Sequence, residues 1–132
     1  MPYKWKLNTD IAGRDKIIFG EYDPDAYAGG IRNFEGMQLD TLKKLIEKNF
    51  IRAAERQNEA PTTAQILAFM ERYPEYTAHG YAVTSKRFDY RVTIEGVSKG
   101  NVADTVQELE DFTRLFGNAD NFNTGIMDCW FD

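Results

Sequence analysis

The residues best suited to nucleophilic chemistry in this sequence are its one histidine, His79, and its one cysteine, Cys129. A thiol–imidazole pair acts as a nucleophile only when the two side chains lie within hydrogen-bond reach and the thiol pKa is lowered. His79 falls on the apolar side of an alternating segment, and Cys129 alternates with Met127 and Phe131. This pattern predicts a core histidine and a small buried cysteine, so we expect no catalytic residue.

Two further segments have weak features of ligand sites. Asp23 and Asp25 lie two residues apart, as in a calcium loop, but Pro24 intervenes and the closing Glu of such a loop is missing, so a turn supported by aspartate side chains is favoured. The Gly-Gly pair at 29–30 lacks the strand-to-helix context of a dinucleotide site. With no Gly-rich phosphate loop and no paired-cysteine motif, we expect neither a metal ion nor a cofactor.

The formal net charge of −5 is concentrated at the C-terminal end. Residues 1–60 hold ten basic and ten acidic side chains, and residues 61–100 hold five and four. Residues 101–132 hold a single basic side chain, Arg114, against seven acidic ones: Asp104, Glu108, Glu110, Asp111, Asp120, Asp128 and Asp132. Phosphate-backbone binding needs Lys and Arg, so we expect no direct nucleic-acid binding there. A basic protein partner is compatible with this charge.

The helix expected after Gly100 carries the candidate partner-binding surface. Asn101 is a suitable cap, and Thr105 with Glu108 offers a capping box one turn later. Spacing at 100° per residue predicts one apolar stripe facing the core: Val102, Val106, Leu109, Phe112 and Phe116. The candidate partner-binding residues share the opposite side: Asp104, Glu108, Asp111 and Leu115. Carboxylates there would steer a basic partner and Leu115 would supply buried area, although a single exposed Leu is also ordinary surface.

Apolar and polar residues alternate strictly at 87–95, which predicts a strand. The segment 76–84 precedes it with two residues between them, so we expect the two to form a hairpin. Even loop lengths give three pairs on the helix-packed face: Val83 with Phe88, Tyr81 with Tyr90 and His79 with Val92. The outer face of the hairpin would carry six other residues: Ala78, Gly80, Ala82, Arg87, Asp89 and Arg91. Its small residues leave space for a peptide or an anion, but a solvated sheet with cross-strand ion pairs explains the same pattern.

Local patterns elsewhere predict the remaining elements. Alternation predicts a strand at Tyr3–Leu7, and an apolar run predicts a second strand at 16–22. Apolar spacings of three and four predict a helix over 39–50, and Thr62 with Gln65 begins another that Pro74 ends. A final strand is expected at 126–131. The adjoining hairpin therefore predicts an α+β fold, with a mainly antiparallel sheet of about four to five strands and about three helices packed on one face.

Composition bounds the class of protein. A chain of 132 residues with 42% hydrophobic and 28% charged residues is ordinary globular material, so we expect a single domain over 1–132. No segment approaches the roughly 18 consecutive apolar residues of a membrane span, and the N-terminus lacks the apolar run of a signal peptide. One cysteine cannot cross-link its own chain, so we expect a cytoplasmic protein without membrane association.

The runs 78–83 and 89–96, together with the terminal Cys-Trp-Phe-Asp at 129–132, resemble small uncharacterised proteins of Gram-positive bacteria. Such proteins are often found on conjugative or other mobile elements. The resemblance extends over most of the chain from about Glu21. It implies a bacterial cytoplasmic accessory protein, and it carries over no activity and no catalytic residues.

The leading hypothesis is a non-enzymatic accessory or regulatory protein that binds another protein through an acidic C-terminal surface. One alternative is an acidic DNA-mimic inhibitor of a defence or restriction protein, although mimicry requires carboxylates spread over a long surface. The other alternative is a small enzyme that uses carboxylates or the pair His79 and Cys129.

Overall fold

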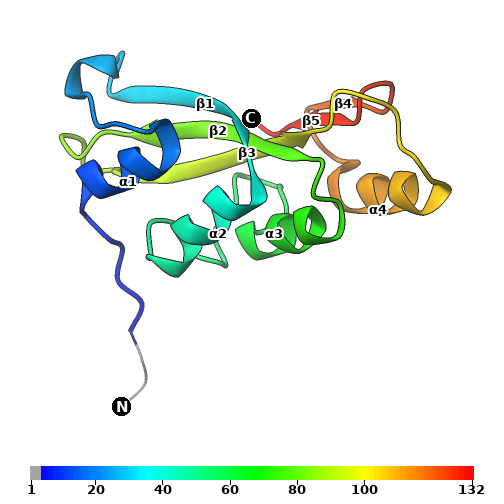
Figure 1. The fold of residues 1–132 in the computed structure, drawn as a ribbon, viewed down its shortest axis with the longest axis horizontal. Coiled ribbons are helices and arrows are strands. Elements are labelled where there is room, and N and C mark those ends of the chain that lie inside the picture. Colours follow the sequence, from blue (N-terminus) through cyan, green and yellow to red (C-terminus); the bar gives the residue numbers. More distant parts are fainter. Residues whose placement is uncertain (1–3) are drawn as a thin grey trace.

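The computed structural model describes residues 4–132. Its elements in chain order are α1 (Ile11–Phe19), the short 3-10 helix η1 (Pro24–Ala26), β1 (Ile31–Met37), α2 (Leu39–Glu47), α3 (Thr63–Arg72), β2 (Thr77–Val83), β3 (Val92–Ser98), α4 (Val106–Phe116), β4 (Asn121–Asn123) and β5 (Asp128–Trp130), as drawn in Figure 1.

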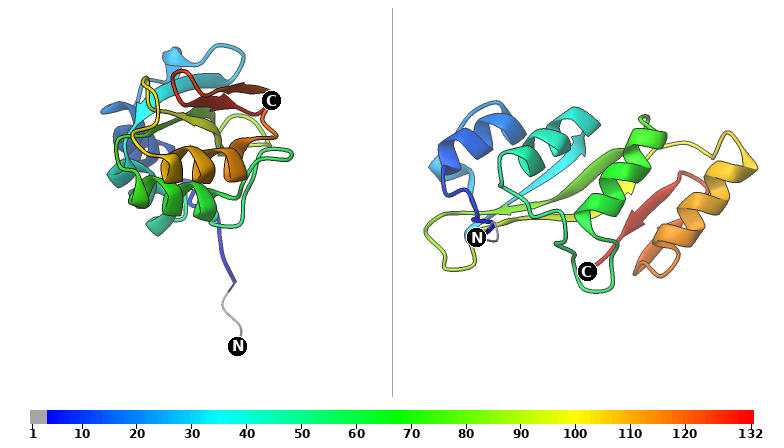
Figure 2. Two further views of the ribbon diagram at one scale, coloured as in Figure 1. Left: turned by 90° about the vertical axis from the view of Figure 1, so that its right-hand side faces the viewer. Right: turned by 90° about the horizontal axis from the view of Figure 1, so that it is seen from below.

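The strands form one antiparallel sheet in the order β1-β2-β3-β5-β4. Helices α1 to α4 lie in a row across one face of this sheet, which is clearest in the view from below in Figure 2. The arrangement confirms the predicted α+β class and the antiparallel sheet with helices on one face. The described residues contain one α-helix more than expected, because α1 replaces a predicted strand.

Helix α1 forms where the strand at 16–22 was predicted. The Asp10 side chain caps it by accepting a hydrogen bond from the Gly13 N–H, and Gly20 ends it with a left-handed φ of 83°. The apolar run Ile17–Phe19 fits a strand or a helix equally well, so the capping residues Asp10 and Gly20 are what favour the helix. Of the strand predicted at Tyr3–Leu7, Tyr3 lies outside the described residues and the remainder is irregular.

The start signal of α3 behaves as the sequence predicts. Thr62 and Gln65 form the reciprocal capping box, and α3 ends one residue before Tyr73, which precedes Pro74. Helix α4 starts from Thr105, whose hydroxyl accepts from the Glu108 N–H, one turn later than a cap at Asn101 would place it. Gly117 follows α4 in a right-handed conformation, and its N–H donates to the Thr113 carbonyl.

The faces of β2 are the reverse of those predicted. Ala78, Gly80 and Ala82 are buried and pair with inward-facing residues of the neighbouring strands, while His79 and Tyr81 face the side without α-helices. Apolar area favours bulky residues for the core, but this face holds small ones; at Gly80 an added Cβ would lie 1.9 Å from the Thr93 carbonyl oxygen of β3. Strands β2 and β3 are also joined by a long connection, 84–91, rather than a tight turn.

A cluster of aromatic rings from α3, the 73–76 connection, α4 and β4 lies in and against the core: Phe69, Tyr73, Tyr76, Phe112, Phe116 and Phe122. Phe69 lies between the two helices, with ring centroids 4.8 Å from Tyr76 and 5.1 Å from Phe116. Edge-to-face contacts of this kind add to the burial of apolar area. The cluster therefore joins α3 firmly to α4.

The C-terminal segment is part of the sheet. Cys129 is fully buried in β5, which pairs with β4, and the Phe131 N–H donates to the Glu95 carbonyl at 2.7 Å. These contacts confirm the prediction that Cys129 is a packing residue in a terminal strand.

Strand β1 forms one edge of the sheet and contains an irregularity. Phe34 pairs with Gly80 and Met37 with Ala78, so Glu35 and Gly36 together lie opposite one residue of β2. Gly36 has a φ of 67°, which glycine adopts without steric cost. Among residues 4–132, no helix has the length and apolar content needed to cross a bilayer.

Candidate functional site

The four predicted partner-binding residues do not share one exposed face of α4. Glu108 and Asp111 are buried, with 3% and 8% of their surface exposed, and Leu115 is partly buried. Asp104, just before the helix, is exposed. The prediction that these side chains form one outward surface was therefore wrong.

The cost of burying the charged Glu108 is offset by hydrogen bonds to both of its carboxylate oxygens. Lys99 Nζ donates to both carboxylate oxygens, at 3.2 and 3.0 Å, the Tyr76 hydroxyl donates at 2.8 Å, and the Asp104 N–H donates at 3.1 Å. Burial alone raises the pKa of Glu108, but these donors and the charge of Lys99 outweigh it and hold that pKa below its ordinary value. Burial and the neighbouring carboxylate raise the pKa of Tyr76.

Asp111 forms a second cluster at the α3–α4 contact. It accepts from the Tyr73 hydroxyl at 2.5 Å and from Gln107 Nε2 at 2.9 Å, and it forms ion pairs with Arg72 at 3.1 Å and Arg114 at 3.2 Å. The hydrogen bond from Tyr73 and these cations lower the pKa of Asp111. The two carboxylates of α4 thus bind α3 and the end of β3 rather than a partner.

The orientation of α4 follows from these contacts. Phe112 and Phe116 enter the aromatic cluster, as predicted, and are fully buried. On the side of α4 next to these two rings, the carboxylates Glu108 and Asp111 contact Tyr73, Tyr76 and Lys99. The helix is therefore rotated about its axis relative to the predicted orientation. Nothing in the spacing within 101–117 indicates these partners, because the tyrosines lie more than thirty residues earlier in the chain.

The rotation leaves aliphatic side chains in water. Val102, Val106 and Leu109, predicted to face the core, are 56%, 72% and 39% exposed. Val102 lies in the segment that leads into α4, and Val106 and Leu109 lie on the helix itself; we call these three residues the α4 stripe. Leu109 also borders a shallow hollow of about 520 Å³ with Glu110, Thr113 and Arg114. Because α4 already packs on its other side, the α4 stripe is apolar area without a partner in the described chain.

The outer hairpin face predicted from alternation is not formed. Its small residues are buried under the helices, and its charged residues gather in the connection 84–91. Arg87 donates to Asp89 at 2.9 and 2.8 Å, and Arg91 donates to Asp89 at 3.1 Å and to the Tyr81 hydroxyl at 2.7 Å. The hydrogen bond from Arg87, and then that from Arg91, lowers the pKa of Asp89. Both guanidinium groups are thus engaged with one carboxylate, but these pairs lie within the connection 84–91 and are not the cross-strand ion pairs that were expected on a solvated sheet.

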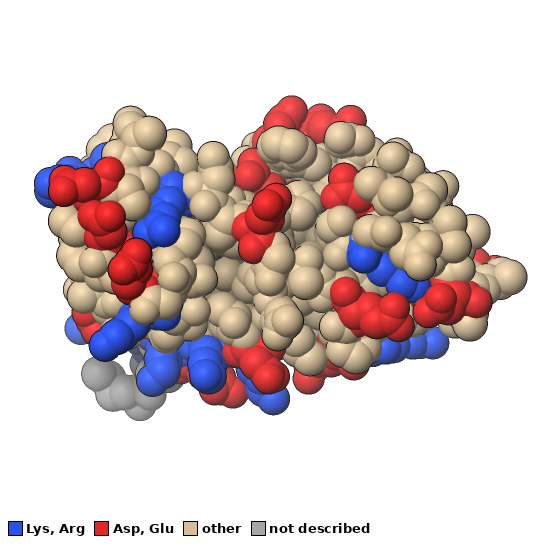
Figure 3. Space-filling model, turned by 45° about the horizontal axis from the view of Figure 1, so that its top comes forward, with Lys and Arg blue, Asp and Glu red and all other residues tan. Residues whose placement is uncertain are grey.

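His79 lies on the uncovered face of the sheet, not on the helix-packed face where it was predicted. Its side chain is 18% exposed in a hollow of about 390 Å³, where Glu95, Asp128 and Trp130 also lie. Figure 3 is turned toward this face, and acidic side chains border its hollowed middle part. His79 Nε2 is 3.0 Å from the Cys129 carbonyl oxygen and 3.8 Å from Asp128 Oδ1.

The pair His79 and Cys129 is not arranged for nucleophilic chemistry. The imidazole contacts the backbone carbonyl of Cys129, whereas the cysteine itself is fully buried. Burial raises the pKa of the thiol to about 12, which disfavours the thiolate. Within the described part of the chain, no group of three or more His, Cys, Asp or Glu side chains is arranged to hold a metal ion.

The chain matches no protein-family model, no curated protein and no solved structure. The candidate binding surface is therefore defined only by the geometry of α4 and the segment that leads into it. The molecule is an antiparallel α+β protein in which the C-terminal helix is packed on one side and apolar and exposed on the other.

Proposed function

We propose that this protein is a non-enzymatic accessory protein that binds another protein through its C-terminal helix. The observation that carries the proposal is the exposure of the α4 stripe: Val106 and Leu109 lie on a helix whose other side is already packed, and Val102 lies in the segment that leads into it. Amphipathic helices commonly bind such stripes through aliphatic side chains at matching spacing. The accessory role is what the resemblance of residues 78–96 to small mobile-element proteins implies.

The partner that fits this surface is an amphipathic helix with an aliphatic face and basic residues at its edges. Glu110 is exposed on the same helix and supplies negative charge to the rim, and Asp104 is also exposed although it forms an ion pair with Lys99 at 3.1 Å. Carboxylates at a rim speed association with a basic partner and favour one register. A DNA-mimic role has less support, because Glu108 and Asp111 are turned inward and paired and do not contribute to an acidic surface.

The test is a Val106→Asp variant compared with a Phe88→Asp control in affinity capture from the native host. Val106 is the first residue of α4, where an added carboxylate is favourable to the helix, so this variant should fold normally. Phe88 is fully exposed in the 84–91 connection, far from α4, and gives a matched loss of exposed apolar area. We expect Val106→Asp to lose a partner that Phe88→Asp retains, with unchanged melting temperatures.

Binding of the purified partner then measures the effect directly. Val106→Asp should weaken the dissociation constant by about tenfold or more, since burying an unpaired charge in an apolar contact is costly. If Val106→Asp keeps every partner of the wild-type protein with the same affinity, the α4 stripe is not the binding surface.

A further inference from the structure

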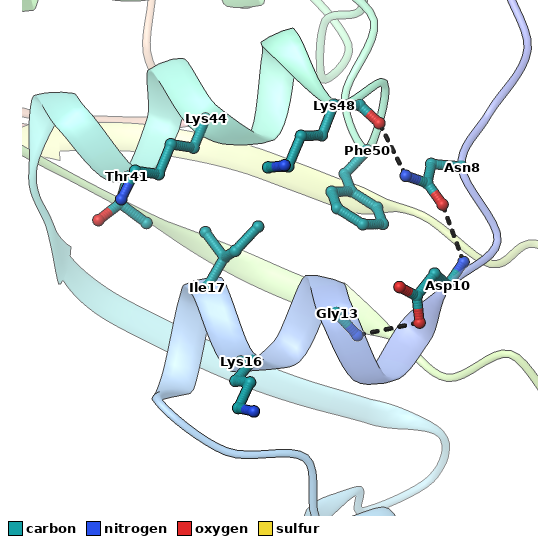
Figure 4. A pocket seen from close by; sticks show the side chains of 9 residues that line it. All are labelled: Asn8, Asp10, Gly13, Lys16, Ile17, Thr41, Lys44, Lys48 and Phe50. Atoms are coloured by element: carbon teal, nitrogen blue, oxygen red, sulfur yellow. Dashed lines mark hydrogen bonds between the residues drawn. The ribbon is translucent and has the colours of Figure 1, made fainter.

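A large hollow lies between α1 and α2, at the opposite end of the molecule from α4 (Figure 1). Its volume is about 610 Å³, within the range of small-molecule sites, roughly 300–1,000 Å³. Figure 4 shows its lining side chains, which we call the α1–α2 groove: Asn8, Asp10, Gly13, Lys16, Ile17, Thr41, Lys44, Lys48 and Phe50. Residues 41, 44 and 48 share one face of α2 because they recur at helical spacing.

The α1–α2 groove carries an excess of positive charge. Three lysines line it, Lys16, Lys44 and Lys48, against one carboxylate, Asp10. The Asp10 carboxylate already caps α1 by accepting from the Gly13 N–H at 3.0 Å. Among the residues that the structure describes, none of the three lysines forms an ion pair. Three cations therefore border one hollow without a carboxylate to neutralise them.

Some other cations of the chain are paired or stacked. Lys99 forms ion pairs with Glu75, Asp104 and Glu108, at 3.7, 3.1 and 3.0 Å. Arg32 lies over the ring of Phe19, and Arg52 over that of Trp5. The lysines of the α1–α2 groove have neither kind of contact within residues 4–132, although like charges gathered around a hollow repel one another. A bound anion would remove that repulsion.

The donor set indicates which anion. Lysine is a compact point charge with three donors and binds phosphate readily, whereas a planar carboxylate is best matched by the fork of arginine, which the groove lacks. The Thr41 hydroxyl also borders the groove, the Asn8 amide is engaged with Lys48 and Asp10, and Figure 4 shows Ile17 and Phe50 facing the interior. Cations at the wall beside apolar side chains fit a phosphate group joined to an apolar body.

We propose that the α1–α2 groove binds a phosphate monoester of a small organic molecule, with Lys44 and Lys48 of its α2 wall at the phosphate and Ile17 and Phe50 against the organic part, while Lys16 points away from the groove and adds only its positive field (Figure 4). This site is separate from the α4 stripe and does not depend on the function proposed for it.

The test uses phenyl phosphate as the probe and amide chemical-shift titration as the measurement. We expect saturable shifts in α1 and α2, with Lys44→Gln and Lys48→Gln each raising the dissociation constant by about tenfold, the usual effect of one lost charge-assisted hydrogen bond. Lys43→Gln is the matched control, because Lys43 is exposed on the same helix but does not line the groove. Lys43→Gln should change the dissociation constant for phenyl phosphate by less than about twofold, because the effect of one distant surface charge is screened by salt.

Two comparison ligands and one membrane assay complete the test. Inorganic phosphate should bind more weakly because it lacks the apolar body, and benzoate should bind more weakly because it lacks the phosphate. Vesicles of phosphatidylcholine with and without phosphatidic acid separate a free phosphate ester from a lipid headgroup, since only a headgroup site gives co-sedimentation that Lys44→Gln abolishes. Equal losses for Lys43→Gln and Lys44→Gln, or benzoate binding as tightly as phenyl phosphate, would overturn the proposal.

Discussion

Glu108 accepts hydrogen bonds at both oxygens of a buried carboxylate, and its pKa is held below the ordinary value of about 4.3. Its contribution to stability is therefore present above that ordinary value and is lost as the pH falls through the lowered pKa. Asp111, with its own lowered pKa, acts in the same direction. We expect the free energy of unfolding, measured by urea denaturation, to decrease as the pH falls from about 5 to 3.

A Glu108→Gln variant isolates this contribution. It should lower the free energy of unfolding at pH 7 by about 2 kcal/mol, because Lys99 keeps its charge and loses a buried partner. Glu108→Gln should also make the free energy of unfolding less dependent on pH in the acid range. Glu110→Gln is the control, since Glu110 is exposed on the same helix. An unchanged acid slope in Glu108→Gln would contradict the inward orientation of this side chain.

At the scale of the elements, α1 is attached to the sheet by a buried polar cluster around Arg14. Arg14 and Asp15 are both fully buried and pair with each other at 2.9 Å. Arg14 also donates to the Val83 carbonyl at 2.9 Å and to the Tyr27 hydroxyl at 2.7 Å, and Tyr27 in turn donates to Asp15. Burial and the hydrogen bond to Asp15 raise the pKa of Tyr27, so its hydroxyl stays protonated as a donor.

Removing Arg14 alone should lower the free energy of unfolding more than removing Arg14 and Asp15 together. Arg14→Met leaves the Asp15 carboxylate buried without its cation, and we expect a loss of about 3 kcal/mol in the free energy of unfolding. The double variant Arg14→Met with Asp15→Leu should recover part of that loss. Urea denaturation followed by circular dichroism measures both. A double variant less stable than Arg14→Met would show that the hydrogen bonds to Val83 and Tyr27, rather than charge compensation, hold α1 in place.

The elements that could be predicted from the sequence are those with a local cause. The capping box of Thr62 and Gln65, the break at Pro74 and the spacing of Leu42 and Leu45 are encoded within one helix each. The face of β2 could not be predicted in this way, because Ala78 and Ala82 become core residues only where helices approach closely. The orientation of the α4 carboxylates could not be predicted for a similar reason, since the two tyrosines that donate to them, Tyr73 and Tyr76, come from a distant part of the chain. The α4 stripe and the α1–α2 groove therefore required the structure.

At the scale of the whole molecule, the C-terminal residues complete the sheet and the core. Phe131 is 2% exposed, while its neighbour Trp130 is 46% exposed. We expect Phe131→Ala to lower the free energy of unfolding by about 3 kcal/mol and Trp130→Ala by about 1 kcal/mol, since only Phe131 leaves a cavity. Deleting residues 126–132 also removes buried Met127 and Cys129 and should cost at least about 5 kcal/mol. A shortened protein that keeps its melting temperature would show that this segment is an appendage.

The two proposed surfaces lie at opposite ends of the row of helices, as Figure 2 makes visible. The groove end carries the unpaired lysines of α1 and α2, and the α4 end carries the acidic residues 101–132. Occupation of one surface leaves the other accessible, so a phosphate ester and a protein partner can be bound together. The acidic end also disfavours contact of α4 with a polyanion.

The irregular edge strand β1 has a consequence for behaviour at high concentration. A long edge strand with free N–H and C=O groups is a template on which a second molecule can add its own strand, the first step of sheet-to-sheet aggregation. Here Glu35 and Gly36 interrupt the regular pairing of β1, and Glu35 places an exposed charge at that point. At the opposite edge, β4 is only three residues long. Both borders of the sheet thus resist extension by another chain, and this fold protects itself from fibre growth by local geometry and charge.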